Sequence, residues 1–425
     1  MLQELTIQRF KTIKDQHLSL GRVNLFIGGN GTGKSNLLEA IGLTSACLGR
    51  GLGDSDIGQK GLRITPPELM KSSFKNDELP KTLALSAKFS GGVEYSATLQ
   101  SRERDPLLRF FTEKCEFGGK TIFGRSNRGA RAMGVSLSDR VEQNRGLWDQ
   151  VKVTYPMPAE VDNEFSEFSK HLIYTPQTDF LRGRQSGRID SPPIGLHGEG
   201  LPEAVSSFLR ARRKLRPKRS KDASKTEWEI IESCAKLIWL PGWAREFGAH
   251  RAKSQLTSRD MPDRSSQIVY FVDRFMHASR NRLSVYDSSE GTLFLLFAAI
   301  ILAHPDAPKT FALDNVDSGL NPKLTRLLIE HIINICTLTA DNDTKIGARQ
   351  VFLTSHNPTA LDAFDLFDDN QRVFIVRRNE KGHTTATPLR PAEGMSREDW
   401  ELTKGGRNLS QLWLDGDIPG ALGEL

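Results

Sequence analysis

Gly28-Gly29-Asn30-Gly31-Thr32-Gly33-Lys34-Ser35 is the stretch that decides the fold of this 425-residue chain. The apolar run from Arg22 to Ile27 precedes it and predicts a buried strand, and residues Asn36 to Ile41 follow it with helical apolar spacing. The stretch fits the pattern G-x-x-x-x-G-K-[ST], whose glycines let the backbone turn tightly enough to aim many N–H groups at one anion. Strand, glycine-rich loop and helix together predict a polyphosphate-binding loop.

The residue types of this loop predict separate roles for its members. The helix that begins at the loop adds unsatisfied N–H groups and the positive end of its dipole. We expect Lys34 to reach the β- and γ-phosphates and the hydroxyl of Ser35 to ligate Mg²⁺. The expected nucleotide contacts in this stretch are Gly28, Asn30, Gly31, Thr32, Gly33, Lys34, Ser35 and Asn36.

The composition is that of a soluble globular protein, with 38% hydrophobic and 26% charged residues. Its net charge of +6 is a mild excess that does not by itself establish a nucleic-acid partner. The N-terminus predicts a strand and no signal peptide, and no apolar run reaches the roughly 18 residues of a membrane helix. We therefore expect a cytoplasmic protein without a membrane segment. Four widely spaced cysteines are typical of reduced thiols: Cys47, Cys115, Cys234 and Cys336.

Two apolar strands in the second half end in polar residues that suit nucleotide chemistry. Residues Thr310 to Leu313 are followed by Asp314, which we expect to hold Mg²⁺ together with Ser35. Residues Val351 to Thr354 lead to His356, which we expect to hydrogen-bond the γ-phosphate or to position the attacking water.

Alternating apolar and polar residues predict three hairpins, whereas residues 48–80 and 101–150 lack clear periodicity. We expect residues 48–80 to form a surface insertion with little function of its own. The paired strands are 5–11 with 17–20, 83–89 with 93–99, and 373–378 with 383–388.

A dense basic run lies between two predicted helices, Leu201 to Leu209 and Glu227 to Ile238. Nine lysines and arginines fall between residues 210 and 225, and no aromatic residue interleaves, so base stacking is not expected there. The run fits either contact with a nucleic-acid backbone or a solvated helix hairpin. The candidate nucleic-acid contacts are Arg210, Arg212, Arg213, Lys214, Arg216, Lys218 and Arg219.

These motifs together resemble those of the ABC-type ATPases of the SMC, RecF and OLD (overcoming lysogenisation defect) group, often labelled AAA-type ATPases in bacteria. The resemblance extends over almost the whole chain, although residues 48–190 contribute little to it. The residues that carry it are Phe10-Lys11, Gly28 to Ser35 with Asn36-Leu37-Leu38-Glu39, His197 to Leu201, Ser289-x-Gly291-Thr292, Asp314 to Pro322, and Thr354 to Pro358.

The resemblance implies an α/β fold of the P-loop NTPase type, with a mixed β-sheet and flanking helices, an antiparallel β subdomain and an inserted helical lobe. Three parts are expected. They are residues 1–194, the N-terminal half of the ATPase head with the phosphate loop and the β subdomain; residues 195–260, the helical lobe with the basic run; and residues 261–425, the C-terminal half of the head.

The resemblance also implies ATP and Mg²⁺ held in a head-to-tail homodimer. Lys34 and Ser35 of one subunit would face Ser289 and Gly291 of the other, where a helix N-terminus caps the γ-phosphate. Phe10 would lie either near the adenine or in the core. Two glutamines are candidates for linking Mg²⁺ to the helical lobe, Gln177 and, as a rival, Gln143.

Asn315 occupies the position at which this group usually has the catalytic glutamate. An amide cannot accept a proton from water, and loss of such a base typically slows the chemistry by about 10²–10⁴-fold. Asp317, three residues after Asp314, is the candidate substitute. We therefore expect a slow ATPase, or one that mainly binds ATP.

Two functions fit these features. The first is an ATP-gated, DNA-associated ATPase of bacterial genome maintenance or anti-phage defence that acts through a separate effector, such as a nuclease. The tail of about seventy residues after His356 is too short for the TOPRIM nuclease domain that OLD proteins carry. The alternative is a non-hydrolysing, ATP-bound scaffold or sensor that holds a toxic effector inactive. Missing Leu-Ser-Gly-Gly-Gln and Asn-Lys-x-Asp motifs disfavour a transporter ATPase and a GTPase, respectively.

Overall fold

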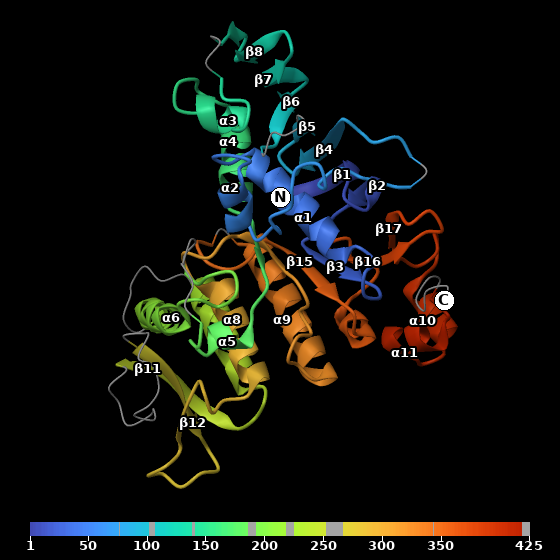
Figure 1. The fold of residues 1–425 in the computed structure, drawn as a ribbon. Helices are drawn as coiled ribbons and strands as arrows, with labels where there is room; N and C mark the ends of the chain where they lie inside the picture. Colours follow the sequence, from blue (N-terminus) through green and yellow to red (C-terminus); the bar gives the residue numbers. More distant parts are fainter. Residues whose placement is uncertain are drawn as a thin grey trace. The chain divides into compact units, whose positions relative to one another are not determined.

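The computed structural model describes residues 1–75, 77–101, 107–137, 141–185, 193–217, 225–251, 267–342 and 344–418 (Figure 1). Two compact units divide the chain. The first unit comprises Met1–Ile173, Thr310–Asp314 and Phe352–Leu425, and the second comprises Tyr174–Lys309 and Asn315–Val351. The finer division expected at residues 194 and 260 stays a prediction.

A six-stranded mixed sheet carries the phosphate loop. Strand β16 is parallel to β3 and antiparallel to β17, as expected for the mixed sheet of an α/β P-loop fold. The sheet order is β10 (Leu172–Tyr174), β14 (Thr310–Leu313), β15 (Gln350–Ser355), β3 (Val23–Ile27), β16 (Gln371–Arg378) and β17 (Thr384–Pro388).

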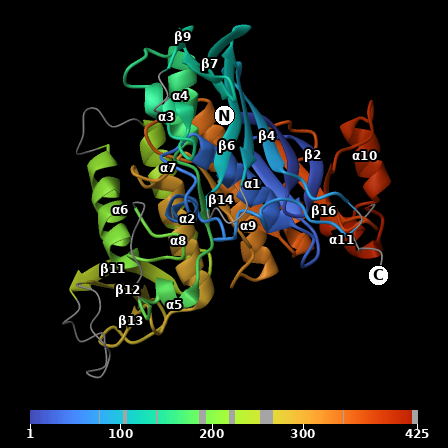
Figure 2. The ribbon, with the colours of Figure 1, turned by 45° about the horizontal axis from the view of Figure 1, so that its top comes forward.

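An antiparallel sheet of eight strands forms the predicted β subdomain in the first unit; its strands β4, β6 and β7 are visible in Figure 2. Both hairpins predicted before residue 100 are confirmed. The order is β2 (Ile13–Ser19), β1 (Leu2–Phe10), β4 (Thr82–Phe89), β5 (Val93–Gln100), β6 (Arg109–Phe117), β7 (Lys120–Ser126), β8 (Gly129–Ala132) and β9 (Val135–Ser136).

Strands β6 to β9 occupy the region in which the sequence showed no clear periodicity. The pairing of β5 with β6 shifts register between Thr98 and Leu99, and that of β6 with β7 shifts between Cys115 and Glu116. Such an irregularity moves the following residues to the other face of the sheet, so the apolar alternation is interrupted within the strand.

Helix α1 (Lys34–Cys47) lies in the core of the first unit, and every residue in it except Ser35 is buried. Residues of both sheets share that core, among them Phe26 and Leu85. Phe10 belongs to it as well and is 0% exposed, so its ring is a core residue and does not face an adenine. The shorter helices of this unit are α2 (Asp54–Gln59), α3 (Leu147–Val151), α4 (Ala159–Phe168), η2 (Pro358–Ala363), α10 (Arg397–Lys404) and α11 (Leu409–Asp415).

Helix α8 (Glu290–Ala303) is the centre of the second unit, and all of its residues from Thr292 onward are buried. Its sequence is apolar all round, as is typical of a helix enclosed by other elements. The unit also contains a three-stranded antiparallel sheet, β11 (Ala244–Arg251), β12 (Gln267–Asp273) and β13 (Arg282–Ser284), in addition to the expected helices. Packed on α8 are α5 (Thr178–Leu181), α6 (Leu201–Leu215), α7 (Lys225–Lys236), η1 (Leu237–Trp239) and α9 (Pro322–Ala340).

All four cysteines lie among the described residues, and each is a buried free thiol. Within the same described ranges, no helix combines the length and the apolar character needed to cross a lipid bilayer.

Candidate nucleotide site

The phosphate loop joins β3 to α1 inside the first unit. Gly31 and Gly33 have φ values of 76° and 103°, in the left-handed region that glycine adopts without strain. A Cβ at Gly28 would lie 2.1 Å from the carbonyl oxygen of Val376, and one at Gly33 would lie 2.1 Å from Oγ1 of Thr384. Glycine is therefore required here both by the turn of the loop and by its packing against β16 and β17.

The first turn of α1 has no side chain that caps it. Gly33 is the N-cap residue, and the turn contains no acidic residue. A Cβ at Gly31 would meet no described atom within 4 Å, so the loop is open at this point. The N–H groups at the start of α1 are thus free of a side-chain cap and oriented as an anion site requires.

Lys34 folds back over this loop. Its side chain is buried, and its Nζ donates to the carbonyl oxygens of Gly28 and Gly29, each at 2.8 Å. The ammonium group is therefore already held at the loop backbone. Its transfer to phosphate oxygens stays a prediction.

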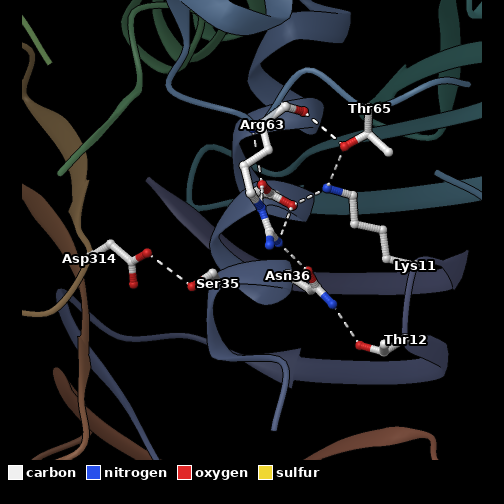
Figure 3. Close-up of polar contacts among 8 residues, drawn as sticks. Lys11, Thr12, Ser35, Asn36, Arg63, Thr65 and Asp314 are labelled. Atoms are coloured by element: carbon white, nitrogen blue, oxygen red, sulfur yellow. Dashed lines mark hydrogen bonds and ion pairs between the residues drawn. The ribbon is translucent and has the colours of Figure 1, made fainter. Parts of the chain in front are cut away.

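Asp314 accepts hydrogen bonds from two hydroxyl groups at the end of the mixed sheet. Ser35 Oγ donates to one carboxylate oxygen at 2.9 Å (Figure 3), and Thr354 donates to the other. Hydroxyl and carboxylate oxygens are the ligands that Mg²⁺ prefers, and the adjacent uncapped helix start suits its phosphate partners. The residues present therefore fit a Mg²⁺–nucleotide.

A polar network that sequence analysis missed lies on the first turns of α1. Glu39 is buried, forms an ion pair with Lys11, and accepts hydrogen bonds from the backbone N–H (3.1 Å) and Nε (2.7 Å) of Arg63. Arg63 also donates to Oδ1 of Asn36 at 2.6 Å (Figure 3). Residues 48–80 were expected to have little function, yet Arg63 from this segment fixes the side chain of Asn36. A lone arginine in a segment without periodicity gave no signal for this role.

Three threonines connect the same network to the phosphate loop. Asn36 Nδ2 donates to Thr12 Oγ1 at 2.7 Å, and Thr12 Oγ1 lies 2.7 Å from Thr384 Oγ1. The hydroxyl of Thr384 donates to the carbonyl oxygen of Thr32 at 2.8 Å. The loop is thereby tied to the β1–β2 turn and to the first residue of β17.

The electrostatics of this network favour an anion at the start of α1. Burial alone would raise the pKa of Glu39, but Arg63 and Lys11 outweigh burial and lower it. Burial lowers the pKa of Lys11 in spite of Glu39, and the hydrogen bond to Glu39 raises the pKa of Arg63. Two cations and one carboxylate give a net positive charge beside Asn36, which attracts phosphate.

Asn315 begins a tight turn in the second unit. Its φ is 57°, in the left-handed region that asparagine enters more readily than glutamate. The N–H of Ser318 donates to the carbonyl oxygen of Asn315 at 3.0 Å, and Asp317 is buried within the turn. The backbone conformation thus gives a reason for asparagine at this position. The catalytic roles expected for Asn315 and Asp317 stay predictions.

His356 lies directly after β15, and its side chain is exposed. The preceding Ser355 is buried, and its Oγ accepts the N–H of Asn357 at 3.0 Å. Asn357 Oδ1 in turn accepts the N–H of Thr359 at 3.0 Å and caps η2. This hydrogen-bonded turn fixes the backbone at His356, in the same unit as the phosphate loop.

Helix α8 begins at Ser289, whose Oγ caps the first turn by accepting the N–H of Thr292 at 3.3 Å. Gly291 packs against the turn described above, because a Cβ at Gly291 would lie 2.8 Å from the carbonyl oxygen of Gly319. Gly319 itself packs on Glu290, whose Cγ would lie 2.8 Å from a Cβ at that position. The start of α8 and the turn after Asn315 therefore form one close-packed block.

Gln177 is the N-cap residue of α5 in the second unit. Its N–H donates to the carbonyl oxygen of His197 at 2.9 Å, and the following Thr178 donates its hydroxyl to the carboxylate of Glu290. The segment at His197 thus holds Gln177, and α5 is bonded to the start of α8. The rival Gln143 lies in the first unit, where its carbonyl oxygen accepts the N–H of Phe110 at 2.7 Å. A Mg²⁺ role for either glutamine stays a prediction.

The last turns of α6 carry most of the described part of the basic run, Arg216 is the C-cap residue of α6, and Lys225 begins α7. Arg212 makes two hydrogen bonds to the carboxylate of Glu232 on α7, at 2.8 and 2.9 Å. At least one arginine of the run therefore has a structural partner, and cations at a helix C-terminus also complement its dipole. Lys218 and Arg219, which were candidate nucleic-acid contacts, lie outside the described residues.

Two protein-family models match the chain, one in each half. Residues 4–129, which contain the phosphate loop, match the family described as AAA domain. Residues 251–362, which contain Ser289, Asp314 and His356, match the family described as AAA domain, putative AbiEii toxin, Type IV TA system.

Solved structures similar to this chain include the SMC head domain from Thermotoga maritima. The two share 13% identity with a TM-score of 0.41, over 92% of this chain and 99% of that one. The recombination mediator protein RecF-ATPrS of the RecFOR pathway shares 14% identity with a TM-score of 0.33, over 92% and 98% of the two chains. No curated protein sequence matches the chain.

Proposed function

We propose that this chain, whose two halves each match an AAA-domain family model, is an ATPase that binds Mg²⁺–ATP in its first unit and closes around it as a head-to-tail homodimer. The observation that carries the proposal is the hydrogen bond from Ser35 to Asp314. It joins the hydroxyl of the phosphate loop to a strand-end carboxylate that lies 279 residues away in the chain. Ser35 and Asp314 are the two oxygen donors that a Mg²⁺ ion on a bound polyphosphate requires.

Several groups of the first unit make separate contributions to nucleotide binding. The uncapped start of α1 provides backbone N–H donors, and Lys34 provides a positive charge already placed at the loop. Asn36 is held by Arg63, so its side chain is fixed before the nucleotide arrives. ATP supplies the phosphoanhydride bond whose cleavage would reopen the closed state.

The second unit supplies the groups for closure. Ser289 is exposed at the start of α8, where a second copy of the chain can present it to a γ-phosphate. Hydrolysis in the closed state is expected to be slow because Asn315 provides no base. The left-handed backbone at Asn315 favours asparagine. The amide at this position is therefore consistent both with the fold and with slow ATP hydrolysis.

The test is nucleotide binding measured by calorimetry with Mg²⁺–ATP. Lys34→Ala should weaken binding by at least about 100-fold, because it removes the charge aimed at the phosphates. Lys120→Ala, at an exposed lysine in the same unit, should bind like the parent chain. Tight ATP binding by Lys34→Ala would overturn the proposal.

Ser35→Ala provides a second, milder test. ATP binding should persist, but its enhancement by Mg²⁺ should disappear, since Asp314 alone would remain as a protein ligand. An unchanged Mg²⁺ dependence would show that Ser35 and Asp314 do not form the metal site.

We further propose that nucleic acid contacts the end of α6. The exposed Arg213 and Lys214 are better candidates than Arg212, whose charge is paired with Glu232. Anisotropy of a labelled DNA duplex should show a salt slope lower by about 1 for Lys214→Ala, with a smaller change for Arg212→Ala. Arg326→Ala, on α9, is the control. Equal slopes for all variants would favour the solvated hairpin.

A separate effector, such as a nuclease or a toxin, completes the proposal in either of two forms. Phosphate release that rises with double-stranded DNA, and vanishes in Lys34→Ala, would favour the DNA-linked ATPase of genome maintenance or anti-phage defence. Retained ATP binding without turnover would favour the alternative, an ATP-bound scaffold that holds the effector inactive. Asn315 is the observation that keeps this alternative open.

A further inference from the structure

The start of α8 contains a chain of hydrogen bonds that the proposed function does not yet use. Trp243 Nε1 donates to Thr292 Oγ1 at 3.0 Å, and Thr292 Oγ1 lies 2.7 Å from Ser289 Oγ. The backbone N–H of Thr292 also donates to Ser289 Oγ, at 3.3 Å. Thr292 is fully buried, whereas Ser289 is exposed. The chain of bonds therefore runs from a half-buried indole, through a buried hydroxyl, to an exposed one.

The donor and acceptor capacities of these groups set the direction of each bond. An indole N–H can only donate, so Thr292 Oγ1 accepts from Trp243. If Ser289 also donated to Thr292, the buried hydroxyl proton of Thr292 would have no acceptor among the described residues. A buried donor without an acceptor is unfavourable. Thr292 therefore donates to Ser289.

This direction leaves one hydrogen-bonding capacity on Ser289. Its two lone pairs are occupied by the hydroxyl and the backbone N–H of Thr292, so only its own O–H proton remains. A group that can only donate is suited to an anion and not to a cation. We propose that Trp243 and Thr292 are positioning residues that hold the Ser289 proton outward, toward the γ-phosphate bound by a second copy of the chain.

Trp243 links this relay to the three-stranded sheet. It directly precedes β11, its carbonyl oxygen accepts the N–H of Arg274 at 3.0 Å, and its ring centroid lies 5.6 Å from that of the buried Phe271 on β12. The indole is therefore held at the end of the β11–β12 pair where Ala244 lies opposite Asp273.

This inference rests on the proposed dimer, and ATP-dependent self-association measured by analytical ultracentrifugation tests it. Thr292→Val removes the relay hydroxyl but keeps the backbone cap, and it should weaken association about tenfold. Thr292→Ser should retain association near the parent value. Trp243→Phe removes the indole N–H and shortens the ring system. It should give a smaller loss of about threefold, because the hydroxyls of Thr292 and Ser289 can then donate to each other in either direction.

A double-mutant cycle separates the relay from a merely structural role. Ser289→Ala removes the oriented proton, so adding Thr292→Val to it should cause no further loss of association. ATP affinity of the isolated subunit should be the same in all of these variants, because the phosphate loop belongs to the other unit.

Parent-like association of Thr292→Val, or an undiminished loss in the Ser289→Ala background, would overturn the relay alone. Absence of ATP-dependent association in the unsubstituted chain would overturn the proposed dimer and the relay with it. Loss of ATP binding by the subunit would instead indicate that the variant has disturbed the fold.

Discussion

Helices α1 and α8 both begin at a candidate nucleotide contact, but their first turns are closed by different groups. Helix α1 starts at Gly33, which has no side chain, and its first turn lacks an acidic residue. Helix α8 starts at Ser289, which caps its own turn, and Glu290 follows directly. The first turn of α1 leaves several backbone N–H donors for a ligand. In α8, the side chain of Ser289 already accepts the N–H of Thr292, and one hydroxyl is exposed.

Under the proposed function, this difference would provide two kinds of anion recognition in one chain. An uncapped helix start with glycines on one side can surround a polyphosphate in a single subunit. A capped start with one outward proton provides a single directed contact, which is useful when another site already holds the anion. Binding and closure would then depend on different units.

The largest expected effect comes from closing the α1 end with a side chain. Gly33→Ala places a Cβ at a φ of 103° and 2.1 Å from Oγ1 of Thr384, so nucleotide binding should fall by at least about 100-fold. Gly92→Ala, in the β4–β5 turn of the same unit, is the matched control, because its φ of 74° is also strained but no described atom lies near the new Cβ. Calorimetric affinities that are equal for the two variants would contradict this account of the loop.

A smaller effect, on thermal stability, should show which of the two helix starts binds an anion within a single subunit. Inorganic tripolyphosphate with Mg²⁺ should stabilise the subunit against thermal unfolding by about 3 kcal/mol at a hundredfold excess over Kd. The stabilisation should persist in Ser289→Ala and disappear in Lys34→Ala. Loss of stabilisation in Ser289→Ala at subunit concentrations that exclude association would place an anion site on α8 alone.

The smallest expected effect is on the stability of the fold at low pH. Because the pKa of Glu39 is lowered in the folded chain, its contribution to stability is complete above about pH 4.3 and is lost as pH falls through the lower folded value. Arg63→Ala should raise that pKa, cost about 1 kcal/mol at pH 7, and move the acid-unfolding midpoint to higher pH. Circular dichroism against pH measures both shifts.

The α8 end should not share this acid response. Its capping network consists of neutral hydroxyl and indole groups, so Thr292→Val should leave the acid midpoint where it is in the parent chain. A midpoint that moves equally in Arg63→Ala and Thr292→Val would mean that general destabilisation, and not the charge network, sets the response.

Local sequence patterns predicted the elements that the site is built on. The strand, loop and helix around Lys34 and the apolar strand before Asp314 follow from residues within a few positions of each other, and the structure confirms these elements. The start of α8 at Ser289 was also visible from its Ser-x-Gly-Thr motif.

The partners of these residues could not be predicted, because they are distant in sequence. Arg63 reaches Asn36 from an insertion without periodicity, and Trp243 reaches Thr292 across 49 positions. Charge counting likewise could not show that Arg212 is paired with Glu232. Side-chain partnership depends on tertiary packing, which composition and spacing do not encode directly.

The hydrogen bond from Thr384 to Thr32 has a consequence for how the protein is made. It spans 352 positions, and Gly28 and Gly33 likewise pack on β16 and β17 near the other end of the chain. During synthesis from the N-terminus, the loop emerges early but its supporting strands emerge late. Nucleotide affinity would therefore develop only after the ribosome has made residues 371–388, so ATP would stabilise nascent chains that include β16 and β17 and not shorter ones.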